Sequence, residues 1–177
     1  MNKYIFVCAF FIWFVNGCSA QNCSVTISDN FFDEDVKQEK NIFSCVLQKG
    51  VSIIPHLLDF IDLHDKCRVG FSNPASSLFS EISENNFKGI KAAYLIETLI
   101  HTSAKNHLGF AEMKLFGYCV IVRVKNGEPV MEPMTSEDMS LIKQIYTSWW
   151  LKNQNKSLED IRMENFNILN GSNYMWI

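Results

Sequence analysis

A glutamate and a histidine four residues apart are the strongest candidates for chemistry in this sequence. Glu97 and His101 stand in a run that is otherwise largely apolar, and residues four apart share one face of a helix. A carboxylate beside an imidazole can act as an acid–base pair or supply half of a metal site. Tyr94 falls on the same face, so these three residues form the candidate catalytic set. We favour a mutually satisfied polar pair instead, because buried polar groups need such partners.

A second cluster of acids with a histidine could complete such a site. The run D-F-I-D-L-H-D brings Asp59, Asp62, His64 and Asp65 together at the end of an expected helix. An acid from this run could join Glu97 in a small hydrolase. We favour an exposed polar helix end, because acidic side chains are rarely buried without a partner.

Two adjacent tryptophans, Trp149 and Trp150, are the candidate ligand-binding residues. They could form an aromatic wall for a glycan or another flat ligand. Neighbours on a helix point about 100° apart, so one indole can lie in the core while the other lies at its margin. We favour packing, because aromatic side chains bury the most apolar surface.

The sequence lacks the motifs of several common classes of enzyme and of cofactor-binding protein. It contains no G-x-S-x-G, H-E-x-x-H, Walker or dinucleotide-binding motif. No C-x-x-C pair or His–Cys cluster has zinc-binding spacing. We therefore expect no cofactor and no metal. A net charge of -3 without a basic stripe disfavours nucleic acid as a partner.

The clearest predicted element is a helix over residues 133–153. Thr135 and Asp138 form a T-x-x-D capping box at its start. Its predicted core-facing stripe repeats every three or four residues, with Met139, Ile142, Tyr146 and Trp149 as its members.

The rest of the chain predicts further helices around one hairpin. Helices are expected over residues 33–48, from Ser52 onward, over 87–102 and over 157–163. The β-branched run at 118–124 and the Asn126-Gly127 turn predict a hairpin whose return strand, with Pro129, lies at an edge. The apolar tail should pack back onto the body. We therefore predict a mainly α fold, a compact domain of four to five helices with one small β-hairpin, spanning residues 21–177.

Residues 1–20 have the pattern of a signal peptide. The apolar run from Tyr4 to Val15 is too short to span a bilayer, and small residues at Cys18 and Ala20 suit cleavage before Gln21. The alternative is a lipobox that ends at Cys18, which would then carry a lipid anchor. We favour ordinary cleavage and expect no transmembrane span.

Four cysteines remain after such cleavage, and they are candidates for disulfides: Cys23, Cys45, Cys67 and Cys119. An even count in an exported chain is typical of disulfide bonding. Cys45 could instead be a buried thiol that packs as a small hydrophobe.

Three stretches of the chain carry further motifs: residues 134–161, residues 173–176 (N-Y-M-W) and residues 89–97 (G-I-K-A-A-Y-L-I-E). In these motifs the chain resembles small exported proteins of Bacteroidetes bacteria that have no established function. The resemblance covers about the C-terminal half of the chain. It implies a mainly helical, exported bacterial domain and transfers no catalytic residue.

These observations predict an exported, non-enzymatic accessory or interaction domain of the bacterial cell envelope, in the periplasm or at the outer envelope. Its candidate partners are an envelope protein, a peptide or a glycan. One alternative is a small periplasmic hydrolase that uses Glu97 and His101. Another is an immunity protein that neutralises a toxin, since such proteins are small and often acidic.

Overall fold

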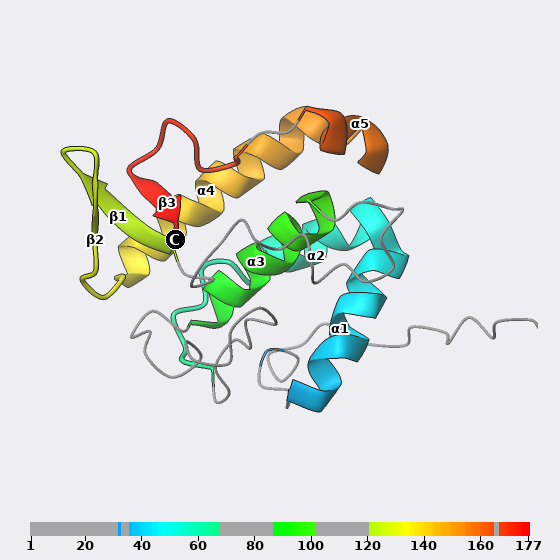
Figure 1. Cartoon of the computed structure of the whole chain (residues 1–177), viewed down its shortest axis with the longest axis horizontal. Helices are drawn as coiled ribbons and strands as arrows, with labels where there is room; N and C mark the ends of the chain where they lie inside the picture. The colour runs from blue at the N-terminus through cyan, green and yellow to red at the C-terminus, as the bar shows by residue number, and fades with distance from the viewer. Residues whose placement is uncertain (1–31, 33–35, 68–86, 102–120, 165–166) are drawn as a thin grey trace, which may run out of the picture.

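The protein is mainly helical with a small antiparallel sheet, as the sequence predicts. The computed structural model describes residues 32, 36–67, 87–101, 121–164 and 167–177. The sheet lies beside the start of helix α4, and α5 follows from the other end of that helix (Figure 1). The elements in chain order are α1 (Val36–Lys49), the 3-10 helix η2 (Gly50–Ile53), α2 (Ile54–Leu58), α3 (Lys88–His101), β1 (Ile121–Lys125), β2 (Glu128–Val130), α4 (Ser136–Asn153), α5 (Leu158–Met163) and β3 (Tyr174–Trp176).

Helix α3 is central, and it is buried from Gly89 to Ile100. A Cβ atom on Gly89 would lie 2.0 Å from the carbonyl oxygen of Ile61, so only glycine permits this close approach. The carbonyls of Leu63 and Asp65 accept hydrogen bonds from the first amides of the helix. These contacts join the end of the α2 region to the start of α3 and satisfy two of the amides that a helix start leaves without an intrahelical partner.

Helix α4 has the predicted start and the predicted buried stripe. Thr135 accepts from the amide of Asp138, and the Asp138 carboxylate accepts from the amide of Thr135, so the capping box is confirmed. All four members of the predicted stripe are buried. Leu141 lies outside that stripe and is 42% exposed. The helix therefore packs one face on the core and presents another to solvent.

The predicted hairpin is present. Asn126 and Gly127 both have positive φ angles, 55° and 84°, as a type I′ turn requires. Pro129 lies on β2, which is an edge strand of a sheet with the order β2-β1-β3. The missing N–H of the proline is therefore accommodated at the edge, as the sequence predicts.

The third strand corrects the prediction of a hairpin alone. The tail packs back onto the body as expected, but it does so as β3, antiparallel to β1. Ile121 pairs with Trp176, and Arg123 pairs with Tyr174. A strand of three residues is too short for a periodic signal, and its partner lies about 50 residues earlier in the chain. None of the described helices is both long and apolar enough to cross a membrane.

Candidate functional site

The predicted contact between Glu97 and His101 is present, with Glu97 buried and His101 partly exposed. The Glu97 side chain is 0% exposed, and His101 Nε2 lies 3.1 Å from Glu97 Oε2. The other carboxylate oxygen accepts a hydrogen bond of 2.6 Å from the Tyr146 hydroxyl. The Trp176 indole N–H lies 3.3 Å from that same oxygen and 3.1 Å from the Tyr146 hydroxyl. We call these four residues the Glu97 cluster, which joins α3, α4 and β3.

The Glu97 cluster is arranged to satisfy a buried carboxylate. Burial raises the pKa of Tyr146 well above its ordinary value, and the adjacent Glu97 carboxylate raises it further. The phenol therefore stays protonated and serves as a hydrogen-bond donor. Tyr94, the third candidate catalytic residue, is also buried, and its ring packs against that of Trp176 with centroids 6.0 Å apart.

The acids of the second cluster have other partners or lie exposed. Asp62 forms an ion pair of 2.9 Å with Lys143 on α4. His64 Nε2 lies 2.7 Å from the carbonyl oxygen of Met134, and the His64 ring stacks on another ring of the core. Asp59 and Asp65 are exposed. No hydrogen bond among the described residues joins any of them to Glu97 or His101.

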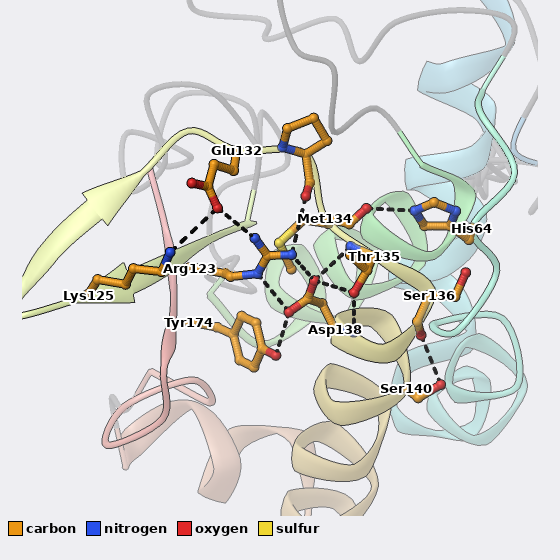
Figure 2. A network of polar contacts seen from close by, with 11 residues as sticks. His64, Arg123, Lys125, Glu132, Met134, Thr135, Ser136, Asp138, Ser140 and Tyr174 are labelled. Carbon is orange, nitrogen blue, oxygen red and sulfur yellow. Dashed lines mark hydrogen bonds and ion pairs between the residues drawn. The ribbon is translucent and has the colours of Figure 1, made fainter.

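A second polar network fixes the sheet to the start of α4 (Figure 2). The Arg123 guanidinium on β1 binds both carboxylate oxygens of Asp138, one of them through Nε at 2.9 Å. Asp138 also accepts from the hydroxyl of Tyr174 on β3, at 3.0 Å. The Arg123 guanidinium also contacts Glu132, which follows β2. We call this the Arg123–Asp138 network.

The Arg123–Asp138 network changes the titration of its members. The hydrogen bond from Arg123 holds the pKa of Asp138 well below its usual range, although burial acts in the opposite direction. Burial, followed by the hydrogen bond to Asp138, raises the pKa of Tyr174 to about 12. Asp138 is therefore an acceptor and Tyr174 a donor at neutral pH.

An open groove of about 640 Å³ lies between α4 and the segment 168–174. Its apolar lining includes Leu141, Ile145 and Trp149 from α4 and Ile168 from the opposite side. A volume of this size is within the range of ligand-binding pockets. We call this feature the α4 groove.

The polar lining of the α4 groove is neutral apart from one lysine. Amides come from Gln144, Asn170 and Asn173, and Ser148 contributes a hydroxyl. Lys152 adds a positive charge. No Asp, Glu, His or Cys is among the described residues that line it. The described lining therefore contains no carboxylate or imidazole that could act as a general base, and no thiol nucleophile.

The two candidate tryptophans occupy different environments. Trp149 lines the α4 groove, whereas Trp150 is absent from the described lining. Their rings are tilted by 41° with centroids 6.1 Å apart, and the residues are only 8% and 9% exposed. Both belong to the hydrophobic core. Packing, the interpretation favoured from sequence, accounts for most of their surface.

The described cysteines correct part of the disulfide prediction. Cys67 is a thiol here and not half of a disulfide. Cys45 is buried in α1, and a disulfide between it and a cysteine outside the described residues stays a prediction. An even number of cysteines does not say which of them lie close together, whereas a disulfide needs two Cβ atoms about 4 Å apart. Cys18, Cys23 and Cys119 lie outside the described residues, as does the predicted signal peptide.

No group of His, Cys, Asp and Glu within the described ranges could hold a metal ion. Comparison with family models, curated proteins and solved structures gives no match for this chain. The resemblance to exported Bacteroidetes proteins therefore stays a prediction.

Sequence reasoning missed the partners that complete both networks. Tyr146 was predicted as a core residue, but nothing local connects it with Glu97, which lies 49 residues away. Asp138 was predicted as a cap, and its pairing with Arg123 was not. The available signal was the presence of polar atoms on residues predicted to be buried, since each such atom requires a partner.

Replacing Tyr146 with phenylalanine should destabilise the protein by about 1 to 3 kcal/mol, because a buried carboxylate loses its shortest hydrogen bond. Glu97→Gln should show coupling with Tyr146→Phe of about 0.5 to 3 kcal/mol in a double-mutant cycle. Urea denaturation measures the free energies of unfolding of wild type, the two single variants and the double variant. Lys156 is half-exposed and forms its ion pair with Glu164, outside the Glu97 cluster, so the effect of Lys156→Ala on stability should add to that of Tyr146→Phe without coupling. Equal stability of wild type and Tyr146→Phe would contradict the role of the Glu97 cluster.

Asp138 should make the protein sensitive to acid. Its pKa is lowered by folding, so its stabilising contribution is fully present above the ordinary Asp pKa of about 3.9 and is lost as the pH falls below it. Asp138→Asn should be less stable than wild type at pH 7 by about 1 to 3 kcal/mol. Urea denaturation between pH 7 and pH 2 should show this difference shrinking as the pH falls. A difference that stays constant would contradict the assignment.

Proposed function

We propose that this protein is an exported, non-enzymatic interaction domain of the bacterial cell envelope, and that it binds its partner in the α4 groove. The observation that carries the proposal is the separation of reactive groups from the concave surface. Glu97 is fully buried within its own cluster, while the described lining of the groove has only neutral groups and Lys152. A groove of this composition suits binding better than catalysis.

The hydrolase alternative has less support. A general base must lie within hydrogen-bond reach of the proton it removes. Both carboxylate oxygens of Glu97 are bonded to side chains of the protein, and neither Glu97 nor His101 is among the described residues that line the groove. The acids at 59–65 add no bond to this pair among the described residues.

Export is supported by the N-terminal pattern. Residues 1–20 combine one lysine, an apolar run and small residues near Ala20. Ordinary cleavage releases the domain, whereas lipidation of Cys18 would anchor it to the envelope. An envelope protein, a peptide and a glycan are the classes of partner to test.

Filling the groove should abolish binding. Ser148 is exposed on α4 and lines the groove, so Ser148→Trp places an indole in the binding space. The mature chain would be screened against displayed random peptides and a glycan array. We expect at least one class to bind wild type and to be lost by Ser148→Trp. Ser140→Trp is the matched control, because Ser140 is exposed on the same helix but is not a lining residue.

Circular dichroism and thermal melting would check that both variants fold. Ligands that bind Ser148→Trp as well as wild type would contradict the proposal, as would the absence of any ligand in both screens.

The mature chain should begin at Gln21. Expression of the full chain in a bacterial host, followed by mass spectrometry of the N-terminus, measures this directly. Cys18→Ser should leave the N-terminus unchanged, because serine is also small enough for the cleavage site. A lipidated N-terminal Cys18 would establish an anchor instead, and an intact Met1 would contradict export.

A further inference from the structure

We propose that the occupant of the α4 groove is an extended peptide segment of a partner protein, with one apolar anchor side chain and an acidic residue near it. This inference rests on the proposed function and specifies the class of ligand. Three properties of the groove support this inference. Its amides make no hydrogen bond to a described residue, its described lining has a single positive charge, and part of that lining is apolar.

The amides of the groove match peptide groups. Gln144, Asn170 and Asn173 are exposed, and their side chains make no hydrogen bond to a described residue. Each primary amide offers both donors and an acceptor. A peptide group presents one N–H and one carbonyl, so it can satisfy both kinds at once. Because these groups come from both sides of the groove, an extended backbone between them could be held along its length.

The charge of the groove selects an acidic ligand. Lys152 lies near the end of α4, and it forms no ion pair with a described residue. Other lysines of the described chain have carboxylate partners, for example Lys143 with Asp62 and Lys156 with Glu164. No carboxylate belongs to the described lining. An acidic side chain of the ligand would supply the missing opposite charge.

The floor of the groove suits an aliphatic or aromatic anchor. Leu141, Ile145 and Ser148 recur along α4 at spacings of four and three, so they face the groove together. Leu141 is 42% exposed at this face. An apolar ligand side chain that covers it would remove apolar surface from water, which is the main favourable contribution to such binding.

A glycan fits the groove less well. Sugar rings bind proteins by stacking on an exposed aromatic face, and such a face is missing among the described lining residues. Trp149 is 8% exposed and Tyr174 is 7% exposed. The Tyr174 hydroxyl is also occupied, because it donates to Asp138. Because so little of either ring is exposed, neither offers a surface on which a sugar could stack.

Charge reversal at Lys152 tests the inference. Random peptides selected on the mature wild-type chain should share an apolar residue and an Asp or Glu at a fixed spacing. Lys152→Glu should select Lys or Arg at the acidic position and should bind the original peptide about fivefold more weakly, as expected for a partly exposed ion pair. Lys49→Glu makes the same change in net charge on an exposed residue outside the groove, so its selection should match wild type. Fluorescence anisotropy with synthetic peptides gives the dissociation constants.

The outcomes separate this inference from the proposed function. Peptides selected without an acidic residue, or bound equally by Lys152→Glu, overturn the inference. Glycans that bind wild type and are lost by Ser148→Trp overturn it as well, but they support the proposed function. Ligands of either class that bind Ser148→Trp as tightly as wild type overturn both this inference and the proposed function.

Discussion

The buried carboxylate of Glu97 is the constraint on which much of the described fold depends. A carboxylate with no exposure must find hydrogen-bond donors within the protein, because leaving it unpaired costs several kcal/mol. Its partners come from α4 and β3 as well as from α3. The position of α3 relative to α4, and of the C-terminal strand relative to both, is therefore constrained by one acidic residue.

The C-terminal strand connects this cluster to the second polar network. Trp176 reaches Glu97, and Tyr174, two residues earlier on β3, donates to Asp138. Asp138 in turn binds Arg123 on the neighbouring strand and caps α4. The sheet is thus tied to the start of α4 by charge and to α3 by the buried indole. A three-residue strand would be marginal alone, and these side chains account for its place.

The same networks matter for function because they hold the side chains that could react in hydrogen bonds with other side chains of the protein. Glu97 and His101 have the residue types and spacing of an acid–base pair, yet their hydrogen bonds are made to neighbouring side chains. The α4 groove has the opposite character, since its amides, the Ser148 hydroxyl and Lys152 are exposed. Of the residues that form the two networks, Tyr174 alone is also among the described residues that line the groove.

The sequence by itself determined what depends on neighbours within about four residues. It predicted the capping box of α4, the Asn126-Gly127 turn and the contact between Glu97 and His101. The tertiary structure alone decided the partners of Glu97 at 49 and 79 residues' separation, the pairing of β3 with β1, and the α4 groove. The physical reason is that local contacts follow from the period of a helix or the geometry of a turn. Distant contacts depend on how whole elements pack, and no pattern within one element records that arrangement.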